Sequence, residues 1–409
     1  MSPSSWVGRR RAALLVLGAL GVLGGIISLV LNPPRGPAVT PRTYRSYTPA
    51  DPRAVVAEVT PRDPREVAMR RELRAAPDRV DLAVKLARID IQRSRTLSDP
   101  RYLGHAQATL GRWYTLASPP PDVLLMRATI RQSLHDFIGA KADLDALIAE
   151  RPRDGQAQLT RAVVLTVTAD YAGARQSCAA IEALVDPLIT ATCYAQIDGV
   201  DGPPGHVVAA IERLSKALES TPNAPESIVS WSLTARAELS IMRGDYGAAT
   251  ADLQRVVAID PDDAYGRAAL ADVLMWTGHP ADASALLAGR EAIDNLLVRR
   301  AIAEHQANGP EAEKWKRAMR DRMAAAAERG DRIHMREEAR FTLEVEGDAA
   351  RALTIALEDW GVQKELADAR LVAAAAAAKG DLAGADPVRS WVKAHGVEDV
   401  QLDKFLGAP

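Results

Sequence analysis

Histidines are the residues of this chain best suited to acid–base or metal chemistry, and the seven of them are scattered singly. None forms an HExxH or HxH motif, and none lies among carboxylates at the spacing of a metal site. His135 and His279 fall between predicted helices, where an exposed polar side chain is the simplest interpretation. The histidines therefore indicate no metal, no cofactor and no catalytic centre, and we expect a protein that is not an enzyme.

Two glycine-rich stretches could hold an ion instead. GDYGAATADLQRVVAIDP, from Gly244 to Pro261, has the glycines of a phosphate cradle, but no strand precedes it and no lysine stands at P-loop spacing. DGVDGPPG, residues 198–205, carries acids three apart, whereas a calcium loop needs more oxygen ligands and a terminal glutamate. We interpret both stretches as turns between helices.

Composition favours helices over sheets. The chain has 409 residues, long for one globular core, and 47% of them are hydrophobic while only 4% are aromatic. Alanine and leucine supply most of the apolar mass, which suits closely approaching helices. The net charge is −2 and the charges are spread along the chain, so we expect no nucleic-acid partner.

The N-terminus predicts a membrane anchor. Ala12–Leu31 is free of charge and gives roughly 30 Å of helix, the thickness of a bilayer core. Three arginines at positions 9–11 adjoin it, so residues 1–11 are predicted to be a short cytoplasmic tail and the body to be periplasmic. A cleavable signal peptide and the reverse orientation are the alternatives. The expected location is the inner (plasma) membrane, crossed once.

Two further features belong to this region. Gly21 and Gly25 form one GxxxG motif, which could support a weak dimer through the anchor helix. Residues 32–64 are rich in proline and read as an extended linker at about 3.1 Å per residue. This stalk would hold the body away from the membrane.

Beyond the linker, the sequence repeats with a period of 34 residues. Phe137 and Tyr171 are 34 apart, and the Gly244-Asp245 turn recurs at Gly278-His279. Small residues recur in the same register at Ala128, Ala162, Ala237 and Ala271, and at Ala140, Ala174, Ala249 and Ala283. This pattern resembles the tetratricopeptide repeat, a pair of antiparallel helices per unit.

The resemblance implies an all-α, right-handed solenoid of helix pairs with a concave face. The clear units lie in residues 121–290, which we take as the core array. Residues 65–120 are expected to form irregular helical pairs, with helices near Val80–Ser94 and Tyr102–Ala117, and residues 291–409 to form degenerate repeats and a cap.

The repeat register also brings the two cysteines together. Cys178 falls on the second helix of one unit and Cys193 at the start of the next helix. Consecutive helices of a solenoid pack side by side, and a periplasmic body permits oxidation, so we expect a disulfide. Two separate buried thiols are the alternative.

Ligands of such proteins usually lie along the concave face, on the first helix of each unit. The matching positions here are Trp231, Thr234, Glu238, Ile241, Met242, Tyr265, Ala268, Asp272, Met275 and Trp276. Their aromatic, methionine and acidic side chains predict a groove for an apolar or basic peptide segment, not an acidic one. In the alternative interpretation, the tryptophans only fill the core between repeats.

The resemblance implies binding and assembly. We therefore expect a non-catalytic, membrane-tethered scaffold for protein–protein interaction. An accessory subunit or an enzyme with its active site in the irregular repeats, near Arg112-Trp113-Tyr114, is a second hypothesis. A regulatory protein facing the cytoplasm is a third.

Overall fold

The computed structural model describes residues 63–97, 99–329 and 335–407, and within them every regular element is a helix. The α-helices and two 3₁₀ turns (η) are, in chain order, α2 (Pro64–Ala75), α3 (Val80–Leu97), α4 (Arg101–Leu110), η1 (Gly111–Trp113), α5 (Pro121–Ser133), α6 (Phe137–Glu150), α7 (Gly155–Val167), α8 (Tyr171–Ile181), α9 (Pro187–Asp198), α10 (His206–Ser220), α11 (Glu226–Met242), α12 (Tyr246–Ile259), α13 (Ala264–Trp276), α14 (Pro280–Leu287), α15 (Asp294–Gln306), α16 (Ala312–Arg329), α17 (Met335–Glu344), α18 (Ala349–Val362), α19 (Leu366–Lys379), η2 (Leu382–Ala385), α20 (Asp386–His395) and α21 (Val400–Leu406).

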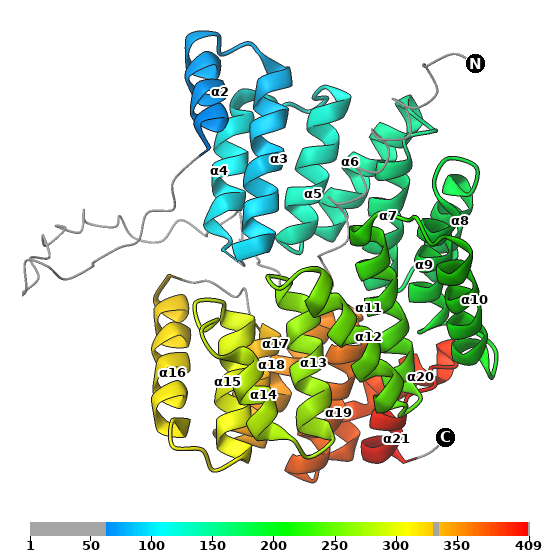
Figure 1. Cartoon of the computed structure of the whole chain (residues 1–409), viewed down its shortest axis with the longest axis vertical. Helices are drawn as coiled ribbons and strands as arrows, with labels where there is room; N and C mark the ends of the chain where they lie inside the picture. Colours follow the sequence, from blue (N-terminus) through cyan, green and yellow to red (C-terminus); the bar gives the residue numbers. More distant parts are fainter. Residues whose placement is uncertain (1–62, 98, 330–334, 408–409) are drawn as a thin grey trace, which may run out of the picture.

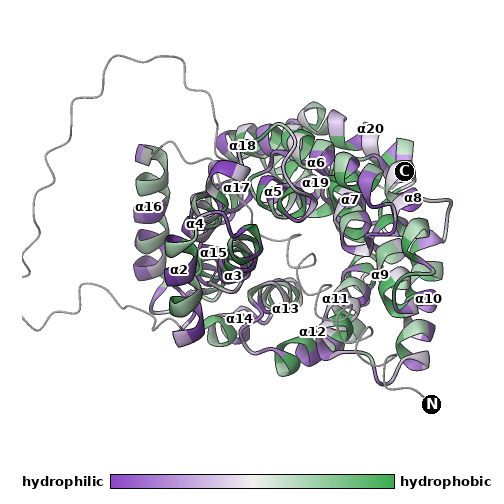
Figure 2. Ribbon diagram, turned by 90° about the horizontal axis from the view of Figure 1, so that it is seen from above, coloured by the Kyte–Doolittle hydropathy of each residue, from purple (hydrophilic) through white to green (hydrophobic). Residues whose placement is uncertain are grey.

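Consecutive helices pack as pairs, α3 with α4, α5 with α6 and so on to α17 with α18 (Figure 1). From above, the pairs curve around into a ring (Figure 2). The N-terminal pair is shorter than expected, because its second helix ends at Leu110, where Gly111 turns the backbone to a φ of 49°. Such a left-handed φ interrupts a helix and favours glycine.

The turn between the two helices has the same local structure in several units. In the unit around Gly244, this glycine has a φ of 75° and ends α11. Asp245 then caps α12, its carboxylate accepting the backbone N–H of Ala248 at 3.0 Å. Aspartate is among the best residues at this position because it satisfies an otherwise free N–H. Asp136, Asp170 and Asp348 cap α6, α8 and α18 in the same way. The stretch is therefore an inter-helix turn.

The recurring alanines mark where paired helices touch. All eight are at most 2% exposed. A small side chain lets two helix backbones approach closely, and a larger one would force them apart. One position earlier than the alanine on the first helix, an arginine reaches across the pair in two units: Arg127 to Asp143, and Arg236 to Asp252.

The C-terminal helices return to the middle of the array. The Trp391 indole N–H donates to the Tyr171 hydroxyl at 2.9 Å, and the backbone N–H of Lys364 donates to the Val167 carbonyl at 2.8 Å. His395 contacts Asp201, in the turn between α9 and α10, at 2.8 Å. These contacts close the ring. The DGVDGPPG turn takes part in this closure through the contact of Asp201 with His395.

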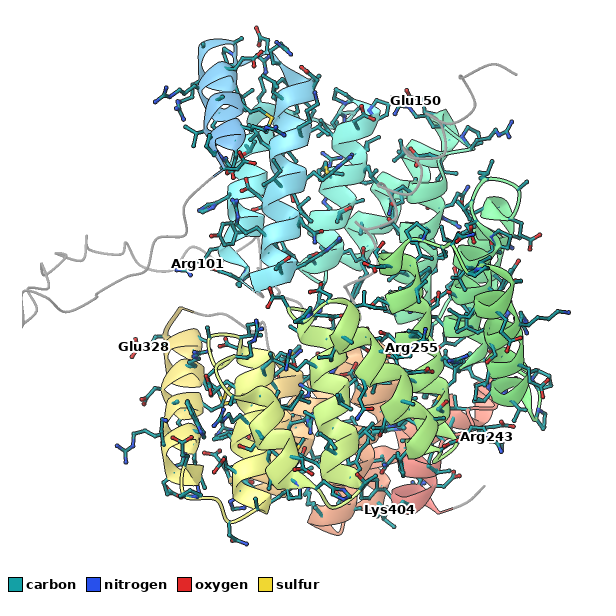
Figure 3. The ribbon with its side chains drawn as sticks, in the orientation of Figure 1. Arg101, Glu150, Arg243, Arg255, Glu328 and Lys404 are labelled. Atoms are coloured by element: carbon teal, nitrogen blue, oxygen red, sulfur yellow. A yellow bond between two sulfur atoms is a disulfide. The ribbon has the colours of Figure 1, made fainter. Side chains whose placement is uncertain are left out.

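The exterior of the ring is polar. Charged side chains such as Arg101, Glu150, Arg255 and Glu328 lie on the outside (Figure 3). Among the described helices, none combines the length and apolar character that a membrane span requires. The predicted anchor at residues 12–31, with the Gly21-Gly25 motif, and nearly all of the predicted linker lie outside the described residues.

Candidate functional site

The inside of the ring holds a cavity of about 620 Å³. It is lined by the odd-numbered helices from α7 through α21, of which those up to α17 are the first helices of their pairs. The volume is within the range of pockets that take small ligands or a short stretch of peptide. The repeat pattern predicts a concave groove along the repeats, and the C-terminal helices α17, α19 and α21 also contribute to the lining of this cavity.

The structure separates the predicted groove residues into two groups. Glu238, Met242, Tyr265, Asp272 and Trp276 line the cavity. Ile241 and Ala268 line it as well, while Trp231, Thr234 and Met275 lie outside its lining and are 7–8% exposed. Trp276 is 41% exposed, so the two tryptophans differ: one fills core and the other faces the interior.

Asp272 is neutralised within the chain. It is 6% exposed, and it accepts hydrogen bonds from Arg299 at 2.7 and 2.9 Å and from Arg340 at 3.0 Å. Burial alone would raise the pKa of this carboxyl, but the two guanidinium groups outweigh burial and hold it below its ordinary value. Asp272 therefore lines the cavity as part of a buried ion cluster.

Glu238 lies in a different environment. Its carboxylate accepts the hydroxyl proton of Tyr265 and forms no ion pair within the described residues. Burial raises the pKa of the Glu238 carboxyl, and it also raises the pKa of the Tyr265 phenol. Across the cavity, Arg336 on α17 pairs with Glu365 and Asp368.

The arginines and Glu365 of this site were not anticipated from the sequence. They lie in residues 291–409, where the repeat pattern is degenerate. Arg336 and Arg340, four apart on α17, share one face of that helix, which is the signal that could have revealed them. Their contact with the central repeats depends on how the ring closes.

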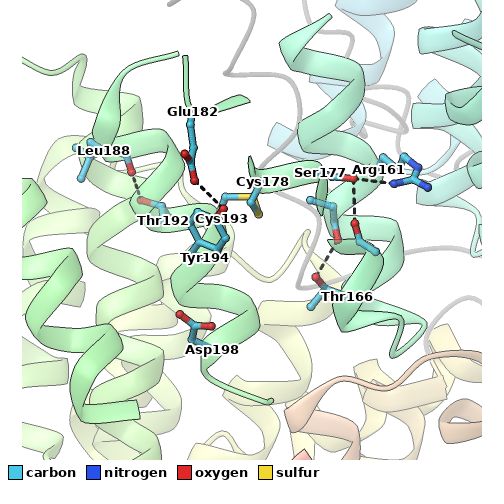
Figure 4. The surroundings of a disulfide bond; sticks show 12 residues. Arg161, Thr166, Ser177, Cys178, Glu182, Leu188, Thr192, Cys193, Tyr194 and Asp198 are labelled. Carbon is cyan, nitrogen blue, oxygen red and sulfur yellow. Dashed lines mark hydrogen bonds between the residues drawn. A yellow bond between two sulfur atoms is a disulfide. The ribbon is translucent and has the colours of Figure 1, made fainter. Parts of the chain in front are cut away.

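The structure joins Cys178 of α8 to Cys193 of α9 as a disulfide, with their Cα atoms 5.9 Å apart (Figure 4). Both cysteines are at most 3% exposed. Beside the bridge, the Tyr194 hydroxyl donates to Glu182 at 2.8 Å. The bond ties together two neighbouring repeat units whose helices line the cavity or support it.

Replacing both cysteines with serine should lower the free energy of unfolding by about 3 kcal/mol, the value expected for closing a loop of this length. Urea denaturation of the variant and of the oxidised wild type would measure the difference. The buried sulfurs should also resist reductant in the folded protein. Two free thiols in the intact mass of the unreduced, alkylated wild type would contradict the prediction.

No group of three or more His, Cys, Asp or Glu side chains is placed to hold a metal ion within the described ranges. The cavity combines apolar walls with charged groups. Phe405, Leu366 and Leu371 add to its apolar lining.

Residues 240–304, from the end of α11 into α15, match the family model of the tetratricopeptide repeat. The match supports the resemblance to this repeat within that segment. Two helix pairs outside this segment share features with it: Asp136 and Asp170 cap α6 and α8, and Ala140 and Ala174 of these helices are buried.

Solved structures with a similar arrangement include PilW, described as a widely conserved type IV pilus biogenesis factor, at 18% identity and a TM-score of 0.40, covering 51% of this chain and 96% of PilW. Yeast Tom70 matches at 12% identity and a TM-score of 0.37, covering 83% and 82%. A tetratricopeptide-repeat protein of Parabacteroides merdae matches at 14% and 0.28, covering 76% and 90%. Likenesses of this size assign no function. A search of curated proteins found no match.

Proposed function

We propose that this protein is a non-catalytic scaffold, tethered to the inner membrane by residues 12–31, that binds a segment of a partner protein inside its ring of helices. The observation that carries the proposal is the cavity of about 620 Å³ lined by the inner helices of the repeats. Tetratricopeptide repeats generally bind other proteins, and this cavity combines apolar walls with a limited number of polar groups.

The membrane tether and the periplasmic side rest on the N-terminal sequence. The apolar run, the adjoining arginines and the proline-rich linker together favour an uncleaved anchor with the body outside the cytoplasm. The disulfide agrees with this location, because oxidising compartments are where such bonds persist. A dimer through the Gly21-Gly25 motif remains part of the proposal.

Proximity labelling by a peroxidase fused to the C-terminus tests these points together. We expect the wild type to label a reproducible set of periplasmic or membrane proteins, and Trp276→Ala to lose that set. Because Trp276 is 41% exposed, its truncation should change the free energy of unfolding by less than about 1 kcal/mol. The control is Leu382→Ala, a similarly exposed residue at 48% that lies outside the cavity lining.

The outcomes separate the parts of the proposal. Labelling of cytoplasmic proteins alone would show that the body faces the cytoplasm, opposite to the proposed orientation. No reproducible neighbour would overturn the scaffold function. Equal loss of labelling in Trp276→Ala and Leu382→Ala would show that the cavity is not the binding site.

A further inference from the structure

The two sides of the cavity differ in polarity. One side consists of the lining residues of α7, of α9 with residues 199–200 after it, and of α11, and it includes Val163, Val200 and Leu239. Among the described lining residues of this side, Glu238 is the single charged one. Its carboxylate accepts a hydrogen bond from the Tyr265 hydroxyl of α13, at the border with the other side. We call the first side the apolar wall.

The other side, formed by the lining residues from α13 to α21, carries both signs of charge, and we call it the polar wall. Asp272 pairs there with Arg299 and Arg340, and Arg336 pairs with Glu365. Its described cations are Arg299, Arg336, Arg340, Lys364, Arg370 and Lys404, and its described acids are Asp272, Glu337, Glu344 and Glu365. Because the two signs are mixed and several of these groups pair with one another, the polar wall favours polar groups of a ligand without selecting one sign of charge.

The apolar wall has few groups that can hold the backbone of a peptide. Its described residues lie within helices, apart from Gly199 and Val200. The N–H groups of these two residues donate to carbonyls of α9 at 3.0 Å. Gln196 supplies the one amide side chain among the described residues of this wall. An extended segment here would therefore leave N–H and C=O groups unpaired, which is costly, whereas a helix pairs them internally.

We propose that the partner segment enters the cavity as a helix with two unlike faces, its apolar face against the apolar wall and its polar face toward the polar wall. This inference rests on the proposed function, and it adds the conformation and the sequence pattern of the partner. Contact with the apolar wall contributes affinity because apolar surface leaves water. Polar side chains on the other face replace the water that the polar wall loses.

The size of the cavity sets the pattern of the segment. A helix about 10–12 Å across that rises about 1.5 Å per residue occupies roughly 120–170 Å³ per residue. The cavity of about 620 Å³ therefore takes roughly four to five helical residues. Residues i, i+3 and i+4 of such a turn lie on one face. We expect apolar residues at these positions and polar residues at i+1 and i+2, with the helix continuing outside the cavity.

Selection of a random twelve-residue phage-displayed library on the immobilised full chain tests the inference. We expect the enriched peptides to share apolar residues at i, i+3 and i+4, and not at i and i+2 as on one face of a strand. In a selected synthetic peptide, proline at position i+2 should weaken binding about 100-fold, because it breaks the helix. α-Aminoisobutyrate at the same position should strengthen binding a few-fold, because it favours the helix before binding.

A matched pair of variants tests the apolar wall. Thr166 lies on this wall, whereas Thr168 is exposed and outside the cavity lining. Both hydroxyls donate to the backbone carbonyl four residues earlier, at 2.8 and 2.9 Å. Thr166→Glu should weaken binding about tenfold or more, because it places a carboxylate against the apolar face of the peptide. Thr168→Glu should bind as the wild type does. A selected peptide with lysine in place of one apolar-face residue should bind Thr166→Glu better than it binds the wild type.

The outcomes distinguish this inference from the proposed function. If no peptide is enriched, the proposed function fails, and this inference fails with it. If the enriched peptides show the alternation of a strand, or if proline leaves their affinity unchanged, only the inference is overturned. Equal binding by Thr166→Glu, Thr168→Glu and the wild type would also overturn it, because the segment would then not lie on the apolar wall. The selection and the proline exchange use the wild-type chain, so they remain decisive if Thr166→Glu does not fold.

Discussion

Replacing Trp391 with alanine should lower the free energy of unfolding by about 3–5 kcal/mol and open the ring of helices. Trp391 is 6% exposed and lies edge-on to Trp360, with the ring centres 5.3 Å apart. Its indole N–H is a hydrogen-bond donor to Tyr171, which is 3% exposed. The truncation therefore leaves a large cavity, and a buried hydroxyl without this partner, where α20 meets α8.

Urea denaturation measures the loss of stability, and small-angle X-ray scattering measures the expected increase in the radius of gyration. Trp391→Phe keeps most of the packing but removes the donor, so it should cost only about 1–3 kcal/mol. Trp276→Ala is the exposed control and should leave both quantities nearly unchanged. A Trp391→Ala protein as stable and as compact as that control would show that the ring does not depend on this contact.

Replacing Asp272 with alanine should cost about 3–5 kcal/mol, because it leaves Arg299 and Arg340 buried with one fewer counter-charge. The control is Asp262→Ala, which removes an exposed partner from Arg290 and should cost at most about 1 kcal/mol. Both are measured by denaturation at neutral pH. Equal effects of the two substitutions would contradict the buried ion cluster.

The effect of pH on Asp272 has a defined sign. The pKa of this carboxyl is lower in the folded protein than in the unfolded chain, so the folded state binds the proton less readily. Its contribution to stability is therefore complete above the unfolded pKa and disappears as the pH falls through the folded pKa. The difference between wild type and Asp272→Ala should shrink in acid, and a constant difference would argue against ion pairing.

Much of the local structure could be predicted from the sequence, because the helices of a repeat pack mainly against helices that are close to them in the sequence. The buried alanines at helix crossings and the aspartates that cap α6, α8, α12 and α18 act within one unit of about 34 residues, so a periodic sequence pattern reveals them. The pairing of Cys178 with Cys193 follows the same logic, since 15 residues separate them and they belong to adjacent helices. The all-helical architecture follows from these local rules.

The tertiary structure alone decided how the array ends. The contact of Trp391 with Tyr171 joins residues 220 apart, and that of Arg340 with Asp272 joins residues 68 apart. Whether such residues meet depends on the small rotation between successive units summed over the array, and no single unit encodes that sum. For the same reason, the sequence alone did not distinguish Asp272, which pairs with Arg299 and Arg340, from Glu238, which has no ion-pair partner among the described residues.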